Sequence, residues 1–525
     1  MGNVAPIIPI TQAGRLIVLR LVAICSHING NPAFYPLVSR KQWQDRYDFF
    51  ATAGANFQMQ PFLDQCRAIV GESHVIVDTG MDAFLTDWRN RFTGSARAVV
   101  QPASSDEAAA IGRLCCEFLV PIVPQGGNTG LVLGSVPDAR GNAIVLSLTR
   151  LNRIREIDVL NNTMTVEAGC LLENVRNAAA EAGLLFPLSL ASAGSCTIGG
   201  NLSANAGGTA VLRYGNAREL CLGLEVVTPQ GEIWNGLRGL RKDNTGYDLR
   251  DIYIGAEGTL GLITAAVLKL FPQPRTMLTA FAALQTPAAA QRLLAIARKH
   301  CDAALTGFEL MSDYSLRLVT KHFPQLAMPL PAQHRQYVLL ELSDGDSQDH
   351  AMAMLEAVIG DAIDEGIVQD AAVASSIAQS RAMWHLREHI SLAQAAEGKN
   401  IKHDIAVPSS RVADFIEATD ALLQQHFPGC RMVTFGHLGD GSLHYNVSAP
   451  EGVAPDEFLR QQGAVNRIVH DSVNSFNGSI SAEHGIGALK RGEILLYKSD
   501  LEIRLMQKIK NALDPLHLMN PGKIL

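Results

Sequence analysis

A run of small residues, SLASAGSCTIGGNLSANAGG, constrains the fold of this chain more than any other feature. It extends from Ser189 to Gly208, carries five glycines in 20 residues and contains no charged side chain. A loop of this length without an apolar face of its own is usually functional or disordered. The absence of charge argues against a solvated linker. Because small side chains allow close approach of the backbone, we expect this run to line a large, flat ligand.

Two further glycine segments lie on either side of this run. PQGGNTGLVLGSVP, from Pro124 to Pro137, follows an expected strand, and DIYIGAEGTLGLIT, from Asp251 to Thr264, precedes another. Consecutive glycines let backbone N–H groups turn inward and form a concavity for anionic oxygens. The first segment is neither a GxGxxG motif opening a helix nor a P-loop. Alone it would be an ordinary hairpin loop, but three such segments predict a dinucleotide-sized ligand in an extended pose.

The order of the expected elements indicates several domains. Short β-type runs alternate with helical patterns around the glycine segments, which predicts an α+β domain. Alanine-rich helices then alternate with strands, and helices dominate from Ala454 onward. A chain of 525 residues is long enough for two to four domains. We expect an extension outside the fold over residues 1–58, with the working protein beginning near Met59, then domains over 59–274 and 275–453 and a helical segment over 454–525.

Composition narrows the class of protein and its partners. The formal net charge is −7 and no basic block is present, so a nucleic-acid partner is not expected. The nine cysteines are odd in number and lack CxxC pairs, which favours a reducing compartment. We therefore expect the cytoplasm, or the mitochondrial matrix in a eukaryote. The apolar run Leu16–Cys25 contains Arg20 and is too short to span a bilayer, which leaves peripheral membrane contact open.

Two histidines flank a glycine turn late in the chain. MVTFGHLGDGSLHYNV alternates apolar and polar residues on both sides of LGDG, which predicts a strand, a turn and a strand. We expect this hairpin to place His437 opposite His444, with Asp440 shaping the turn. Two imidazoles and a carboxylate such as Glu483 suit a divalent transition metal. On these residues alone, exposed polar histidines are favoured over a metal site by about two to one.

Six motifs in order resemble one family, the FAD-linked 2-hydroxy-acid dehydrogenases. They are GGNTG, the long glycine run, TGYDLRDIYIGAEGTLGLIT, GHLGDGSLH, SAEHGIG and the terminal MNPGK, and they cover roughly residues 60–525. The resemblance implies an α+β fold, with a vanillyl-alcohol-oxidase or PCMH-type FAD-binding domain, an α/β substrate domain and a C-terminal helical segment that returns to the flavin. It also implies noncovalent FAD, because the first loop lacks the histidine that some relatives use for covalent attachment.

The resemblance assigns particular residues to the cofactor. The backbone of the first glycine loop would hold the FAD pyrophosphate, the second run would line the flavin, and the third segment would flank the ADP part. The implied FAD-binding residues are Pro124, Gly126, Gly127, Asn128, Thr129, Gly130, Leu131, Ser135, Gly194, Thr197, Gly200, Asn201, Ser203, Gly258, Ile263 and Asn520.

The resemblance favours a metal site at the histidines over exposed polar side chains. It implies a divalent metal, often zinc in relatives, bound by His437, His444 and Glu483. Manganese and cobalt stay open, because two histidines and one carboxylate discriminate poorly between these metals. A metal bound by the substrate hydroxyl and carboxylate would lower the pKa of the alcohol. His484 is implied as the general base that takes the hydroxyl proton, while flavin N5 accepts the C2 hydride.

A second group of residues bears on the substrate. SRAMWHLREHIS predicts a helix in which Arg387 and Ser391 share a face, and Lys402 follows in a strand-like run. Surface charge is the usual role of such cations. The LRE and KxD patterns nevertheless resemble the D-2-hydroxyglutarate dehydrogenase branch, whose matching residues bind substrate carboxylates, with Ser391 in place of a threonine. Asn446 would donate a hydrogen bond to a substrate oxygen. This implies oxidation of D-2-hydroxyglutarate to 2-oxoglutarate, with D-malate as a related substrate.

Other functions remain in competition with this one. D-Lactate or glycolate dehydrogenase of the same family is the nearest alternative. A zinc hydrolase would leave the glycine segments unexplained, and a non-catalytic flavin subunit would be expected to lack the metal and base residues. The electron acceptor, whether a quinone, an electron-transfer flavoprotein or a cytochrome, is left open, as is a homodimer.

Overall fold

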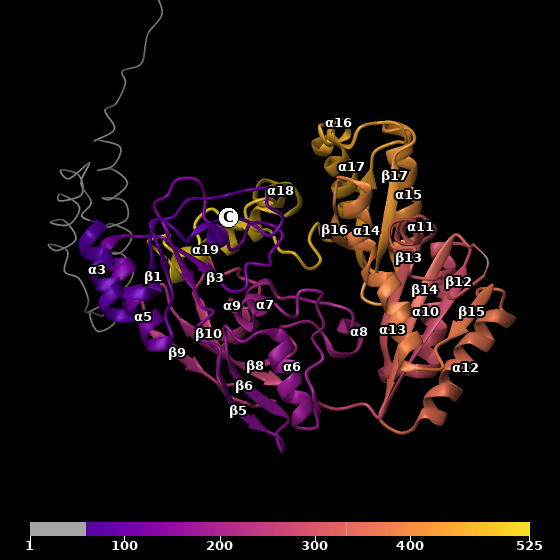
Figure 1. The fold of residues 1–525 in the computed structure, drawn as a ribbon, viewed down its shortest axis with the longest axis horizontal. Helices are drawn as coiled ribbons and strands as arrows, with labels where there is room; N and C mark the ends of the chain where they lie inside the picture. The colour runs from indigo at the N-terminus through magenta and orange to yellow at the C-terminus, as the bar shows by residue number, and fades with distance from the viewer. Residues whose placement is uncertain (1–58, 332) are drawn as a thin grey trace, which may run out of the picture. The chain divides into compact units, whose positions relative to one another are not determined.

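The computed structural model describes residues 59–331 and 333–525 (Figure 1), and residues 62–525 form one compact unit. The expected extension over residues 1–58 lies outside the described residues. A helix, α3 (Met59–Val70), lies where the working protein is expected to begin. Among the described residues, no helix combines the length and apolar character needed to cross a membrane.

A small mixed sheet carries the first glycine loop. Its strand order is β1-β2-β4-β3, with β2, β4 and β3 parallel. Helix α5 (Ser105–Phe118) begins after Ser104, whose side chain accepts the N–H of Glu107 and caps the first turn. The strands are β1 (Val75–Ile76), β2 (Val99–Val100), β3 (Ile122–Gln125) and β4 (Ile144–Ser147), and the short helix α4 (Asp82–Leu85) precedes β2.

A five-stranded antiparallel sheet carries the second and third glycine segments. Its order is β5-β6-β10-β8-β9, and its apolar side chains form one core with helix α6. The elements are β5 (Ile154–Asp158), β6 (Thr163–Glu167), α6 (Leu172–Glu181), β7 (Leu184–Leu185), α7 (Ile198–Ala204), α8 (Val211–Tyr214), β8 (Cys221–Val227), β9 (Ile233–Gly236), α9 (Leu249–Tyr253), β10 (Leu262–Lys269) and β11 (Phe271–Pro272).

The long glycine run is not loop throughout, contrary to expectation, because α7 occupies part of it. Gly199 lies against the end of β6, where an added Cβ would stand 2.6 Å from the Cβ of Ala168. The small residues therefore let a short helix pack directly on the sheet, and they serve the fold as well as any ligand.

A seven-stranded antiparallel sheet forms the second half, in the order β15-β12-β14-β13-β17-β18-β16. Alternate residues of β12 enter opposite cores, with Ala280 and Ala282 on one side and Phe281 and Ala283 on the other. Helices α10, α12, α15 and α17 contribute to the first core, and α11, α13 and α14 to the second. Both faces of this sheet are therefore covered, as Figure 1 shows.

Strands β12–β18 and helices α10–α19 build this half of the described chain. They are β12 (Thr276–Leu284), α10 (Pro287–Cys301), β13 (Leu305–Ser312), α11 (Asp313–His322), β14 (Gln336–Asp344), α12 (Gln348–Asp364), β15 (Asp370–Val373), α13 (Ile377–Glu388), α14 (Ile390–Glu397), β16 (Asp404–Ala406), α15 (Val412–His426), β17 (Arg431–His437), β18 (Ser442–Ser448), α16 (Pro455–Leu459), α17 (Gln462–Ser475), α18 (Arg491–Tyr497) and α19 (Asp500–Leu513).

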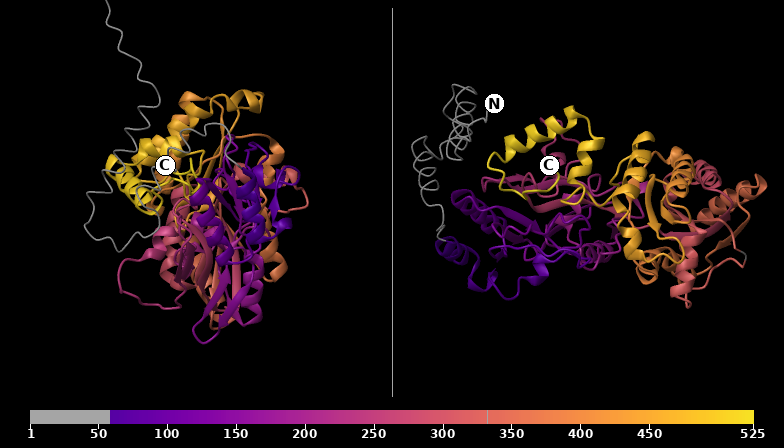
Figure 2. Two further views of the ribbon diagram at one scale, coloured as in Figure 1. Left: turned by 90° about the vertical axis from the view of Figure 1, so that its left-hand side faces the viewer. Right: turned by 90° about the horizontal axis from the view of Figure 1, so that it is seen from above.

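The helices of this half differ from expectation between α13 and α14. The single helix expected over SRAMWHLREHIS is divided at His389, whose ψ of −7° departs from the helical value near −42°. This bend lets Leu386 of α13 and Ile390 of α14 enter the same core. The C-terminal segment reaches the sheet that carries the first glycine loop, because Met519 bridges to Ile122 of β3. In Figure 2 the yellow C-terminal helices accordingly lie beside the indigo and purple segments.

Candidate active site

The histidine hairpin forms as predicted, but its register is shifted from the expected one. β17 ends at His437 and β18 begins at Ser442, so the four-residue turn pairs His437 with Ser442 and Phe435 with His444. The two histidines are therefore diagonal neighbours on one face of the sheet rather than directly opposite. Their ring centroids are 6.2 Å apart. Asp440 shapes the turn as expected, since its Oδ1 accepts the N–H of Ser442 at 2.9 Å.

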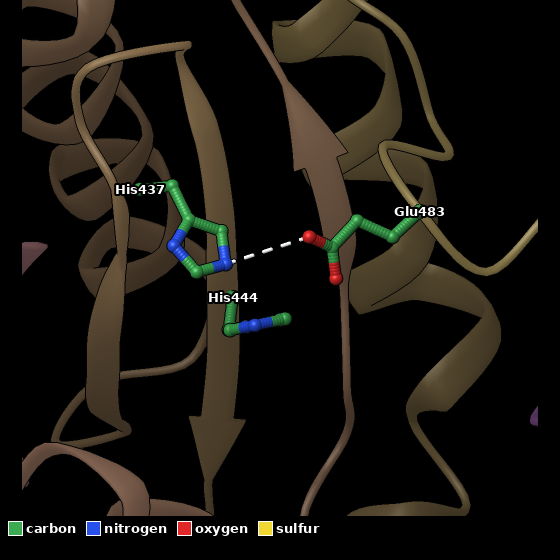
Figure 3. A group of neighbouring side chains, drawn as sticks. All are labelled: His437, His444 and Glu483. Atoms are coloured by element: carbon green, nitrogen blue, oxygen red, sulfur yellow. Dashed lines mark ion pairs between the residues drawn. The ribbon is translucent and has the colours of Figure 1, made fainter. Parts of the chain in front are cut away.

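Glu483 completes a group of three possible metal ligands. Figure 3 shows its carboxylate facing His437 and His444, with Oε1 3.4 Å from Nε2 of His437. One ligand atom from each residue can be chosen so that all three lie within 4.8 Å of one another. Burial lowers the pKa of His444 to about 4, so that its ring is neutral at pH 7 and offers a lone pair. Two imidazoles and a carboxylate at these distances fit a divalent transition metal.

A buried glutamate on the neighbouring strand fixes one of these histidines. Glu309 of β13 is paired with His437 across the sheet, is fully buried, and its Oε1 lies 2.6 Å from Nδ1 of His437. Burial alone would lower the pKa of His437, but the carboxylates of Glu309 and, to a smaller extent, Glu483 outweigh it and raise that pKa to about 10. Because Nδ1 is engaged by Glu309, Nε2 is the nitrogen that faces Glu483.

His484 stands on the other side of His444 and has an acidic partner. The rings of His444 and His484 are stacked with centroids 6.2 Å apart. Asp404 of β16 is 3% exposed, and its Oδ2 accepts the backbone N–H of His484 at 2.9 Å and lies 3.4 Å from Nδ1 of the same residue. This arrangement orients the imidazole of His484. The other oxygen of Asp404, Oδ1, is buried without a hydrogen-bond partner.

Two of the residues predicted to bind substrate, Arg387 and Asn446, lie beside this cluster. Arg387 is 8% exposed and its guanidinium carbon lies 4.8 Å above the ring of Phe435, which contacts His444 with centroids 4.8 Å apart. Asn446 is buried, and its Nδ2 donates to Oε1 of Gln394 at 2.9 Å. Ser391 is exposed on α14, on the far side of the bend from Arg387. The structure therefore does not place Arg387 and Ser391 on one continuous helix.

Lys402 belongs to a group of cations that includes two arginines from the first half of the chain. Although Lys402 retains solvent access, desolvation by the surrounding protein and, to a smaller extent, the charges of Arg89 and Arg91 together lower its pKa to about 8. Asp87 holds this arginine loop in shape by accepting the backbone N–H groups of Arg89 at 3.0 Å and Arg91 at 2.7 Å. Arg89 also acts electrostatically on His484. Neither arginine belongs to a motif that singles it out in the sequence.

The three glycine segments meet, as the sequence predicts. An added Cβ on Gly127 would stand 1.8 Å from the carbonyl oxygen of Ser195, so the first loop lies directly on the second. Glu257 of the third segment donates its N–H to the carbonyl of Ser203 at 2.8 Å. Asn520 then donates to the carbonyls of Gly134 and Glu257 at 2.8 and 2.7 Å. One residue near the end of the chain thus fastens the first segment to the third.

Three of the residues assigned to FAD share an unusual property. Oγ1 of Thr197, Nδ2 of Asn201 and Oδ1 of Asn520 are buried without a hydrogen-bond partner, and all three residues are at most 5% exposed. Buried polar groups without partners are rare in proteins, because each one costs free energy. Gly130 adds to this picture, because an added Cβ there would meet no atom within 4 Å. A polar ligand such as FAD fits this cradle.

The other residues assigned to FAD take several environments. Asn128 and Ser135 are hydrogen-bonded to each other at 2.9 Å, and Asn128 also donates to the carbonyl of Thr86, so their side chains brace the loop. Ile263 is buried in the core, which leaves its backbone for any ligand contact. Gly258 is buried as well, whereas Gly194 and Gly200 are exposed and Pro124, Gly126, Thr129, Leu131 and Ser203 are partly buried.

Comparison with known proteins places this site in a family. Residues 96–236 match the model of an FAD binding domain, and residues 273–524 match the C-terminal domain of FAD linked oxidases. The D-2-hydroxyglutarate dehydrogenase of Xanthomonas citri pv. viticola is 40% identical over 83% of this chain and 91% of its own length. The chain belongs to the FAD-linked D-2-hydroxy-acid dehydrogenases. FAD is accordingly its cofactor, and its substrate is a small hydroxy acid.

Other members of the family and one solved structure are consistent with this. The mitochondrial D-2-hydroxyglutarate dehydrogenase of Arabidopsis thaliana is 35% identical over 87% of this chain and 80% of its own length. A putative mitochondrial D-lactate dehydrogenase of Schizosaccharomyces pombe is 34% identical over 87% and 88%. The structure of p-cresol methylhydroxylase, at 14% identity, covers 89% of this chain and 96% of its own with a TM-score of 0.70, which confirms the PCMH-type α+β fold.

Four residues near the site were not predicted from the sequence. Glu309, Asp404, Arg89 and Glu257 all contact or act on predicted site residues, and Glu257 accepts the N–H groups of Ile486 and Gly487 beside the base. A lone acid within an apolar strand, as in LTGFELMS, was the one available signal for Glu309.

Proposed function

We propose that the chain oxidises D-2-hydroxyglutarate to 2-oxoglutarate, with D-malate as a related substrate. The observation that carries this proposal is the presence of two candidate carboxylate partners, Arg387 beside the histidine cluster and Lys402 in a group of cations with Arg89 and Arg91. Arg387 stacks on Phe435 beside His444. A dicarboxylate needs a cationic partner for each carboxylate, and arginine offers two parallel donors. The substrate named for the bacterial and plant relatives supports the same acid.

Each residue of the site has a role in this reaction. Bound FAD supplies the acceptor for the C2 hydride. His484, oriented by Asp404, takes the proton of the substrate hydroxyl. Arg387 and Lys402 hold the two carboxylates, and Asn446 donates to a substrate oxygen from its second amide hydrogen. Holding the acid at several points fixes C2 in one orientation, which favours one enantiomer.

The proposal includes a divalent metal at His437, His444 and Glu483, with zinc preferred and manganese and cobalt as alternatives. The donor set and its spacing support it. Hydrogen bonding to His437 and the positive charge of His437 outweigh burial and hold the pKa of Glu483 far below its ordinary value, so that its carboxylate is ionised. The metal would polarise the substrate hydroxyl and so ease removal of its proton.

Further aspects of the proposal concern the whole protein. Noncovalent FAD is supported by the first glycine loop, GGNTGL, which contains no histidine. The domain limits at 274 and 453, an electron acceptor of the quinone, electron-transfer flavoprotein or cytochrome type, and a homodimer are part of the same proposal. The mitochondrial names of the plant and yeast relatives support the mitochondrial matrix if the chain is eukaryotic, and the cytoplasm otherwise.

Anaerobic reduction of the bound flavin tests the substrate and the metal together. The purified holoprotein is mixed with D- and L-2-hydroxyglutarate, D-malate, D-lactate and glycolate, before and after chelation. We expect D-2-hydroxyglutarate to bleach the flavin fastest, its L-enantiomer to leave it oxidised, and chelation to slow the reaction until a divalent metal is restored. Faster bleaching by D-lactate would replace the dicarboxylate by the alternative that the fission-yeast relative suggests. Full activity after complete removal of metal would exclude the metal.

A further inference from the structure

One buried carboxylate touches both the metal group and the substrate group of the proposed site. Oε1 of Glu309 lies 2.6 Å from Nδ1 of His437, and Oε2 accepts the Nε–H of Arg387 at 2.7 Å. Glu309 is 0% exposed, so no water competes for either oxygen. The three residues come from β13, β17 and α13, and 128 residues separate Glu309 from His437. An ionised carboxylate here is costly to bury unless both of its oxygens are paired, and they are.

We propose that Glu309 is a positioning residue that fixes His437 and Arg387 together through its single carboxylate. The inference rests on the proposed function, because it takes His437 as a metal ligand and Arg387 as a carboxylate ligand. It adds that the two sites are mechanically linked, so that a displacement of either donor is transmitted to the other. Phe435 provides a second connection between the two groups, since its ring contacts both Arg387 and the second histidine, His444.

The chemistry of the side chain makes this arrangement specific to glutamate. Both neighbours, Nδ1–H of His437 and Nε–H of Arg387, are donors, so the residue between them must accept twice. A carboxylate accepts with two oxygens, whereas the amide of glutamine offers one oxygen and one NH₂ group. Glu309→Gln is nearly isosteric and can therefore satisfy only one of the two donors. The other donor is left unpaired in a dry environment, and its side chain loses its fixed orientation.

The experiment measures metal release rather than turnover. The holoprotein is loaded with Zn²⁺, an excess of a chromophoric chelator is added, and the release rate is followed. The release rate is a property of the protein with Zn²⁺ bound. It is therefore not affected by protons that compete with Zn²⁺ for the side-chain ligands of the metal-free protein. We expect Glu309→Gln to release the metal about 10–100-fold faster, as is typical when a metal-bound histidine loses its carboxylate partner. The KM for D-2-hydroxyglutarate should rise in the same variant.

A matched control exists on the adjacent strand. Glu341 of β14 is partly buried, and its carboxylate accepts from Nε1 of Trp384 and Oγ1 of Thr306 rather than from the site. Glu341→Gln should leave the release rate and the KM within about twofold of the wild type, a change of about 0.4 kcal/mol. Flavin absorbance of each variant shows that the fold and the cofactor are retained.

A double-mutant cycle with Arg387→Met decides whether the link passes through Glu309. Arg387→Met alone should speed metal release several-fold, although Arg387 is not a metal ligand, and should add nothing to Glu309→Gln. Equal release from the wild type and Glu309→Gln, or multiplicative effects of the two substitutions, would overturn the proposal. If Glu309→Gln does not retain flavin, release from Arg387→Met alone decides, because an unchanged rate there excludes the link. A wild type that binds no Zn²⁺ would instead refute the proposed metal site.

Discussion

Lys402→Ala should separate the dicarboxylate substrate from its monocarboxylate alternative. A hydrogen bond to a charged partner contributes about 1.5–3 kcal/mol. Because Lys402 retains solvent access, we expect the lower half of that range, about 1.5–2 kcal/mol. This corresponds to a loss of about 10–30-fold in kcat/KM for D-2-hydroxyglutarate. D-Lactate has no second carboxylate, so its kcat/KM should change less than about threefold.

Steady-state kinetics of both acids, with an artificial electron acceptor, measure this difference. Lys399→Ala is the matched control, because Lys399 is close in sequence but its Nζ is paired with Asp456 at 2.7 Å on the surface. It should leave both substrates unaffected. Equal losses for D-2-hydroxyglutarate and D-lactate in Lys402→Ala would refute the assignment of Lys402 to the distal carboxylate.

The pH dependence gives an independent check on the same residue. The pKa of Lys402 is lowered to about 8, so its positive charge is present below that pH and is lost above it. The kcat/KM for D-2-hydroxyglutarate relative to D-lactate should therefore fall about tenfold between pH 7 and pH 9. Lys402→Arg keeps its charge throughout this range and should remove the fall. A ratio that does not change with pH in the wild type would contradict the role of the Lys402 charge.

The remaining predictions concern the base and the cofactor cradle. His484→Ala should retain FAD, by its absorbance, but slow anaerobic flavin reduction by about 10²–10⁴-fold; a loss below tenfold would assign the proton to another group. Gly127→Ala should abolish soluble flavoprotein because its Cβ would overlap the carbonyl of Ser195, whereas Gly130→Ala, with open space around it, should fold and lose only FAD affinity. The two variants behaving alike would contradict this reasoning. Asn201→Leu should weaken FAD binding, measured by release on dilution, by about 1–2 kcal/mol, because its unpartnered amide faces the cradle; unchanged retention would exclude that contact.

Local patterns in the sequence predicted the local parts of this structure. The hairpin around LGDG and the loop at GGNTG depend on residues within a few positions of one another, and both are present. The meeting of the three glycine segments was predicted from their shared composition. The exact register of the hairpin was not, because it depends on how many residues the turn takes before pairing resumes at Ser442.

Contacts between distant strands could not be inferred from a single sequence. Glu309 reaches His437 only because β13 and β17 become neighbours in the seven-stranded sheet, although three strands lie between them in the chain. Asp404 reaches His484 across 80 residues by a similar route. Arg89 comes from a loop whose shape depends on the backbone bonds to Asp87. These pairings follow from strand order, which local propensity does not determine.

The position of Asn520 has a consequence for how the protein is made. It joins the carbonyls of Gly134 and Glu257, and 386 residues separate it from the first of these. At a synthesis rate of about 5–20 residues per second, the early glycine loop waits about 20–80 s for this fastening to be translated. The contact between the first and third glycine segments therefore cannot close until Asn520 has been synthesised. We expect tight capture of FAD to follow that step rather than the synthesis of the glycine segments themselves.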